Sequence, residues 1–169
     1  MGSISKKMLC EGVTYLKKGI ASVSDLGRED IVVSQPNPEY EHIADHITAM
    51  YAQAGGRSFV QTIMEKKKAA GTTRLTTVHH RETPRRLLQG EADAGPVWHT
   101  EIVEAEKAGL ALEGVAVGRH LDQRHEINYY IAPLRAGRNQ ENARKFTRFI
   151  HTERAGRIFA AYGFIPAKP

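Results

Sequence analysis

The densest cluster of polar side chains in the sequence is the run from His79 through His80, Arg81 and Glu82 to Thr83. Thr83 and the proline after it follow the pattern of a helix N-cap and first helical position, so the run stands at the start of a helix. A helix N-terminus favours negative charge, and Arg81 has the planar fork that binds carboxylates or phosphates, to which His79 or His80 would add hydrogen bonds. The pattern predicts an anion site. The alternative, that these side chains are solvated or bond the local backbone, stays open.

A second candidate is the pair Trp98-His99, which contains the only tryptophan of the chain. The pair stands at the end of an expected strand, where an indole and an imidazole would form an aromatic wall and a polar rim of the same pocket. A single tryptophan in simple packing is the alternative. The position of the pair, rather than its composition, makes it a candidate for ligand binding.

His42 and His46 lie four residues apart on an expected helix and would share one face, a spacing that can hold zinc or another divalent metal. No third ligand has a diagnostic spacing, and histidines on an exposed helix face are common. His42 could instead face the pocket, since it lies near the first turn of its helix. We therefore keep metal binding as an alternative and predict no metal site.

The basic runs at residues 66–68 and 85–86 lie in no recognisable nucleic-acid motif and have no interleaved aromatic residues, so we expect no nucleic-acid partner. Known catalytic motifs are absent from the sequence as well. The sequence has no G-x-S-x-G, G-x-x-x-x-G-K, G-x-G-x-x-G or H-E-x-x-H pattern, and no spacing of acidic residues identifies a catalytic pair. We expect a binding protein without a cofactor and not an enzyme.

Composition sets the wider limits. A chain of 169 residues with 41% hydrophobic residues can build one domain with a real core. The net charge of +5 predicts a surface that attracts anions. The single cysteine, Cys10, excludes an intramolecular disulfide and a thiolate cluster. The N-terminal residues lack the pattern of an export signal, and no apolar run approaches the roughly 20 residues that cross a bilayer, so we expect no membrane insertion.

Strands and helices are expected to alternate along the chain after a poorly anchored arm at residues 1–27. Apolar runs predict strands at residues 31–33, 74–78, 93–98, 112–117 and 127–131. Caps and periodicity predict helices at residues 38–53, 58–70, 83–90, 101–107, 140–151 and 153–161, with a break at Gly55-Gly56. This order predicts an α/β fold with a mostly parallel sheet and helices on both faces.

In such a sheet, ligands bind outside the carboxyl ends of the strands, where the strand-to-helix loops gather. Three loops therefore matter: residues 35–41, 79–83 and 98–100. They share one edge if their strands are parallel.

Several segments, taken in order and spacing, resemble the molybdate-binding-like class of type II periplasmic solute-binding proteins. They are residues 31–33 with 35–39, residues 87–98, and the C-terminal pair at residues 143–150 and 158–164. The resemblance covers residues 20–167 and implies that residues 28–169 form a solute-binding lobe with C-terminal helices. It also implies a periplasmic location and import through an ABC permease.

The resemblance assigns cleft positions as well. The cleft residues of the family map onto Trp98, onto His79, His80 and Arg81, and, in the first loop, onto Tyr40, Glu41 and His42. The family's oxyanion binders mostly use backbone amides, hydroxyls and a tyrosine, so this departure favours an organic or phosphorylated anion over molybdate. Nothing here corresponds to the family's first lobe, so we expect one lobe of a two-lobed clamp. A metal-binding or oligomerisation module, with a possible homodimer, is the alternative.

Overall fold

The computed structural model describes residues 6–10, 18–79, 81–123 and 126–166. Its strands are β1 (Lys6–Cys10), β2 (Val33–Gln35), β3 (Thr73–Leu75), β4 (Gly95–Val97) and β5 (Leu112–Ala116). β2 pairs with β3 in parallel, and a parallel bridge from Val33 to Ala94 joins β2 to the start of β4. β1 lies between β4 and β5 and is antiparallel to both. The order across these strands is therefore β3, β2, β4, β1, β5, with β1 reversed.

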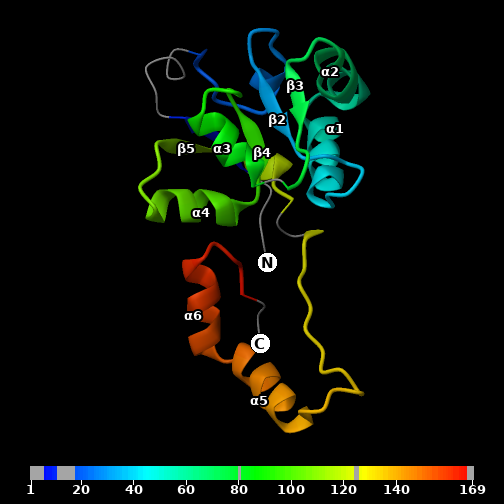
Figure 1. Cartoon of the computed structure of the whole chain (residues 1–169). Helices are drawn as coiled ribbons and strands as arrows, with labels where there is room; N and C mark the ends of the chain where they lie inside the picture. Colours follow the sequence, from blue (N-terminus) through cyan, green and yellow to red (C-terminus); the bar gives the residue numbers. More distant parts are fainter. Residues whose placement is uncertain (1–5, 11–17, 80, 124–125, 167–169) are drawn as a thin grey trace.

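Helices cover both faces of the sheet, with α1 and α2 on one side and α3 and α4 on the other (Figure 1). The α-helices are α1 (Ile43–Gln61), α2 (Lys67–Ala69), α3 (Glu82–Leu88), α4 (His99–Lys107), α5 (Gln140–Ile150) and α6 (Glu153–Ala161). Shorter turns are the 3-10 helices η2 (Ser24–Gly27) and η4 (Arg119–Leu121), and a π-helical turn η3 (Thr62–Lys66) continues α1. The predicted α/β class is confirmed.

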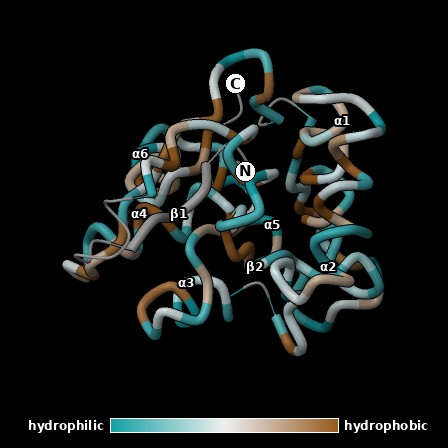
Figure 2. Tube along the Cα trace, turned by 90° about the horizontal axis from the view of Figure 1, so that it is seen from above, coloured by the Kyte–Doolittle hydropathy of each residue, from teal (hydrophilic) through white to brown (hydrophobic). Residues whose placement is uncertain are grey.

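Each face of the sheet has its own apolar core. One core joins α1 and η2 to β2, and its buried members are Ile20, Val23, Leu26, Ile31, Val33, Ile43, Ile47, Met50, Tyr51, Ile63, Ala94, Leu121 and Ile127. The other joins α3 and α4 to β4 and β5, and its buried members are Leu87, Ala92, Val97, Ile102, Ala105 and Leu112. Figure 2 shows the alternation of hydrophobic and hydrophilic stretches along α1 that this one-sided burial requires.

The predicted arm at residues 1–27 is wrong for the described part of that range. Residues 6–10 form β1, which pairs with two other strands. Ile20, Val23 and Leu26 recur every three residues, and all three lie in the core, where each is at most 5% exposed; Leu26 belongs to η2. The sequence pattern missed this segment because its strand pairs with residues about 90 to 110 positions away, and local periodicity carries no information about such pairing.

The first helix starts later than predicted. Asn37 does not cap a helix; its side-chain oxygen accepts a hydrogen bond from the Glu39 amide at 3.0 Å, and its carbonyl accepts from the Glu41 amide at 3.0 Å. These bonds form a turn, so α1 begins only at Ile43. The predicted break at Gly55-Gly56 is confirmed as a kink, in which Gly56 has the φ of +67° that glycine tolerates best.

The predicted strand at residues 127–131 is wrong: the chain there has no strand partner among the described residues. Ile127 is buried, but Tyr130 is 91% exposed. The apolar residues of this run predict burial in the sheet, whereas the chain here leaves the sheet. It continues as an extended segment, residues 127–139, to α5 (Figure 1).

The helices α5 and α6 lie beyond α4, away from the sheet (Figure 1). Asn139 and Thr152 cap them by accepting from the Asn142 and Ala155 amides at 3.2 and 3.3 Å. The bounds predicted for α6 are confirmed, and α5 ends one residue early. The chain after α6 returns to α4, where the Lys107 ammonium lies 3.6 Å from the centre of the Tyr162 ring.

Candidate functional site

The three loops singled out by the sequence leave the same edge of the sheet. β2, β3 and β4 run parallel, as that expectation required. Their carboxyl ends are followed by residues 36–42, 76–81 and the junction of Trp98 with α4. This edge is the place where an α/β sheet of this kind binds ligands, and we take it as the candidate site.

Hydrogen bonds join the first loop to the second through Thr76. The Thr76 hydroxyl accepts from the Asn37 amide at 3.1 Å and donates to the Glu41 carboxylate in a short bond. The Tyr40 hydroxyl donates to the Thr76 carbonyl at 2.7 Å. Glu41 is 8% exposed, and it also accepts from the Asn37 amide at 3.1 Å. Tyr40 and Glu41 thus fix the two loops to each other, which is a structural task.

The carboxylate of Glu82 holds the second loop in place through hydrogen bonds from the loop's backbone amides. One oxygen of its carboxylate accepts from the consecutive backbone amides of Thr77, Val78 and His79 at 3.0, 2.5 and 3.2 Å. The other accepts from the Arg86 guanidinium at 2.8 Å. Burial raises the pKa of Glu82, but the hydrogen bonds from the three amides outweigh burial, so its pKa lies below the ordinary value. The carboxylate stays charged at neutral pH.

Two of the three side chains predicted to bind an anion are exposed on the same loop. The side chains of His79 and Arg81 are exposed, and the Arg81 amide donates to His79 Nδ1 at 3.3 Å. Arg81 precedes α3, and Thr83, the predicted cap, lies within it and bonds the Ser34 hydroxyl at 2.9 Å. His80 lies outside the described residues. The structure therefore presents two of the three predicted side chains to solvent at the site.

Trp98 and His99 stand where β4 passes into α4. Trp98 is half-buried and packs against the core of α1 and β2. His99 is the first residue of α4, not Glu101 as predicted. The turn after α6 closes on it, since a Cβ atom at Gly163 would lie 3.2 Å from the His99 ring. That Trp98 forms a pocket wall and His99 its rim stays a prediction.

The two histidines considered for metal binding differ in their exposure and in their place relative to α1. His42 precedes α1 with a fully exposed side chain, 3.9 Å from Asp45, whereas His46 is half-buried. Within the described ranges, no group of three or more His, Cys, Asp or Glu residues could hold a metal ion. His42 reaches solvent at the site edge rather than a pocket interior.

Sequence reasoning missed the residues that shape the site. Thr76 and Glu82 fix the loops, and the buried Arg86 joins Glu82 to the end of β3 by donating to the carbonyls of Arg74 and Leu75 at 3.1 and 3.0 Å. The sequence signal for Glu82 was its place in the first turn of a helix, where an acid is stabilising. No local signal marks Thr76, because its partners come from another loop.

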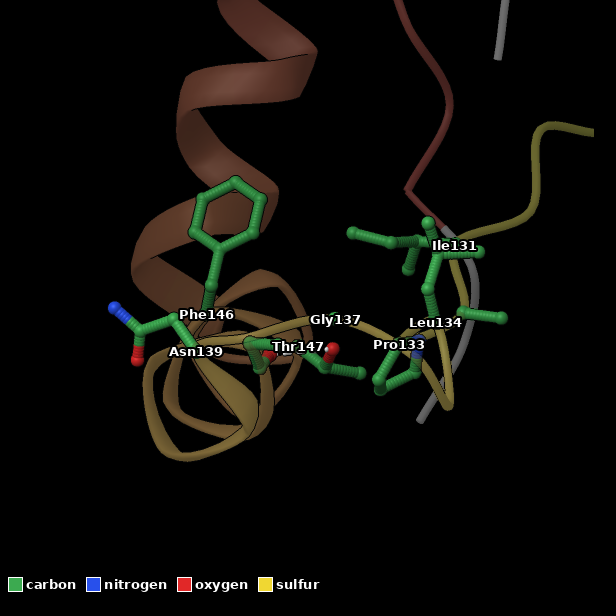
Figure 3. A pocket seen from close by; sticks show the side chains of 9 residues that line it. Ile131, Pro133, Leu134, Gly137, Asn139, Phe146 and Thr147 are labelled. Atoms are coloured by element: carbon green, nitrogen blue, oxygen red, sulfur yellow. Dashed lines mark hydrogen bonds between the residues drawn. The ribbon is translucent and has the colours of Figure 1, made fainter.

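A hollow of about 330 Å³ lies elsewhere in the protein and is lined by the extended segment and α5 (Figure 3). Its walls are mostly apolar and include Ile131, Pro133, Leu134 and Phe146. None of the predicted site residues lines it. In the described part of the chain, no helix combines the length and the apolar character needed to span a membrane.

Comparisons with known proteins agree with this architecture. The family model described as bacterial extracellular solute-binding protein matches residues 6–165. A search of curated proteins found no match. Among solved structures the chain is similar to the sulfate-binding protein SubI from Mycobacterium tuberculosis H37Rv, with a TM-score of 0.77 and 22% identity over 99% of this chain and 57% of that one.

Two further structures show the same fold. L-phospholactate-bound PEB3 has a TM-score of 0.69 and 16% identity, over 99% of this chain and 67% of that one. A periplasmic thiamin binding protein has a TM-score of 0.63 and 16% identity, over 99% of this chain and 52% of that one. The chain thus spans between about half and two thirds of the length of the structures it matches.

Proposed function

The chain belongs to the family of bacterial extracellular solute-binding proteins, and from this membership we propose that it binds a small anionic solute at the carboxyl edge of its sheet. The protein would deliver the solute in the periplasm to an ABC permease and would carry out no chemistry on it. The ligand contacts proposed come from His42 in the first loop, from His79, His80 and Arg81 in the second, and from Trp98 and His99 in the third, while Tyr40 and Glu41 would hold the first loop in place.

The observation that carries the proposal is the exposed Arg81 on a loop that Glu82 holds in place. A guanidinium on a fixed loop binds an anion at a smaller entropic cost than one on a free loop. The net charge of +5 attracts anions toward it. The names of two structural neighbours, a sulfate-binding protein and a phospholactate-bound protein, support an anionic solute.

Replacing Arg81 with Ala tests the site. Loss of one charge-assisted hydrogen bond should weaken binding about 10- to 100-fold, which is roughly 1.5 to 3 kcal/mol. Calorimetry against carboxylates, phosphates and sulfate would measure this loss. The matched control is Arg85→Ala, because Arg85 is exposed on the same helix but bonds Gln89 at 2.6 Å, away from the loop. Equal affinity in both variants would remove Arg81 from the site.

We further propose that the chain acts as one lobe of a two-lobed clamp. The structures it matches are longer, and closure of such a clamp buries a ligand on two sides. A single lobe makes only part of the contacts with the ligand. Losing three or four hydrogen bonds of about 1 kcal/mol each would weaken a micromolar dissociation constant toward the millimolar range. Fusion behind the first lobe of a related full-length protein should restore affinity. Submicromolar binding by the monomeric 169-residue chain would contradict the half-clamp.

A second candidate function is self-association, and one observation favours it. Of the 14 large hydrophobic side chains that are exposed in the described ranges, ten lie between Tyr129 and Ile165. A surface of this kind marks a contact with another lobe or another copy. Phe146, 56% exposed, projects from α5 beside the hollow of Figure 3.

Light scattering of two variants distinguishes self-association of the chain from a contact with another lobe. If copies associate through this surface, Phe146→Glu should shift a dimer to a monomer. The control is Leu88→Glu, since Leu88 is 46% exposed on α3, remote from this surface. A monomer in the unmodified protein would refute self-association and leave the contact to another lobe.

A further inference from the structure

Three consecutive backbone amides in the second loop point at one atom. The amides of Thr77, Val78 and His79 donate to the same oxygen of Glu82. The Thr77 hydroxyl lies 3.2 and 3.3 Å from the two carboxylate oxygens. Converging amides of this kind form a concave site for an anion. Here the anion is a side chain of the chain itself.

The carboxylate is also fixed on its buried side. Arg86 is 8% exposed, and its guanidinium lies 2.8 Å from the second oxygen of Glu82. The same guanidinium donates to the carbonyls of Arg74 and Leu75 and lies 3.4 Å from the Ser34 hydroxyl. Because Arg86 is bound at the end of β3 and beside β2, it holds Glu82 at a fixed distance from the sheet. Residues 77–79, whose amides bond this carboxylate, are therefore held in a fixed position as well.

We infer that Glu82 and Arg86 are a positioning pair that sets the shape of residues 77–79, and that Glu82 occupies the amides which would otherwise bind an anionic solute. The second part rests on the proposed function. It implies that the solute is recognised at this loop by the exposed side chains of His79 and Arg81 instead of by the backbone. Solutes that offer a planar acceptor pair to a guanidinium, such as carboxylates and phosphates, fit this arrangement.

Amide hydrogen exchange, followed by NMR at each residue, tests the first part without any solute. In Glu82→Ala the amides of residues 77–79 should exchange at least about tenfold faster than in the unmodified protein, because each loses a bond to a charged acceptor. Formate should fill the emptied position and restore protection in a saturable manner. Chloride at the same ionic strength should restore much less.

The control is Glu91→Ala, which removes a carboxylate that lies three residues beyond the C-terminal end of α3, 4.0 Å from Arg85. It should leave exchange at residues 77–79 unchanged. Unchanged exchange in Glu82→Ala, or faster exchange that formate does not slow, would overturn the inference. A general role of Glu82 in helix stability would not produce formate rescue confined to these three amides.

Should Glu82→Ala fail to fold, the unmodified protein decides the question. The amide chemical shifts of residues 77–79 should titrate together with the Glu82 carboxyl, with a midpoint below its ordinary value of 4.5. Independent titration would refute the pairing. For the solute, the joint titration of these amides with the Glu82 carboxyl should persist when the solute is bound. Loss of that joint titration on binding would show that the solute displaces the carboxylate from the backbone, and would refute only the second part.

Discussion

The Thr76 hydroxyl bonds two groups of the first loop at the candidate site, the Asn37 amide and the Glu41 carboxylate, so its removal should loosen the site measurably. Thr76→Val keeps the shape of the side chain and deletes its bond to the buried Glu41 carboxylate. A hydrogen bond to a charged group contributes about 1.5 to 3 kcal/mol, whereas the Asn37 amide retains Glu41 as acceptor at 3.1 Å. The variant should therefore lose about 1.5 to 3 kcal/mol of unfolding free energy.

Urea denaturation gives this free energy directly, and thermal melting should show a fall in Tm of roughly 3 to 12 °C for a chain of this size. The matched control is Thr48→Val, because the Thr48 hydroxyl only bonds the Ala44 carbonyl of its own helix at 2.8 Å. That loss should be about 1 kcal/mol or less. A double-mutant cycle that combines Thr76→Val with Glu41→Gln isolates the interaction energy between these two side chains. If Thr76→Val lowers the free energy of unfolding no more than Thr48→Val does, the bond between the loops contributes nothing to stability.

Three other expectations follow from buried or half-buried groups. Tyr51→Phe should lower stability by about 1 to 3 kcal/mol in urea denaturation, because the Tyr51 hydroxyl is the donor at 2.8 Å to the fully buried Gln35 oxygen. Glu82 has a lowered pKa in the fold, so its stabilisation is present above 4.5 and is lost as the pH falls through the folded value; Glu82→Gln should flatten that acid slope. Trp98 emission should change when an anion that binds by calorimetry is added, and unaltered emission would remove Trp98 from the pocket wall.

Local signals in the sequence were sufficient for much of the fold. The glycines at 55 and 56 marked the kink in α1 because Gly56 needs a positive φ, and Thr152 marked the start of α6 because its hydroxyl caps the helix. Each of these features depends on residues within four positions of each other. The alternation of strands and helices was enough to place the three loops on one edge.

Features that depend on distant residues could not be predicted in this way. β1 pairs with strands near the middle of the chain, and nothing in residues 6–10 identifies those partners. Asn37 and Pro38 follow the preferences of a helix start, but the Glu41 carboxylate and the Thr76 hydroxyl take the Asn37 amide into a turn. The same limit hid Thr76 and Arg86, whose roles are defined by contacts across the sheet edge.

The edge proposed for an anion carries two carboxylates, the buried Glu41 and the half-buried Glu82, whose negative charge would by itself oppose anion binding. Both Glu41 and Glu82 are surrounded by donors, and the charge of Glu82 is balanced by the buried Arg86. A charge that is paired in this way has little effect beyond its partners, whereas Arg81 is exposed and its field extends about a Debye length into solvent. The internal acids therefore fix the loops, and under the proposed function the exposed Arg81 would favour an anionic solute. It follows that raising the salt concentration should weaken solute binding through Arg81 while leaving the loop shape set by Glu82 unchanged.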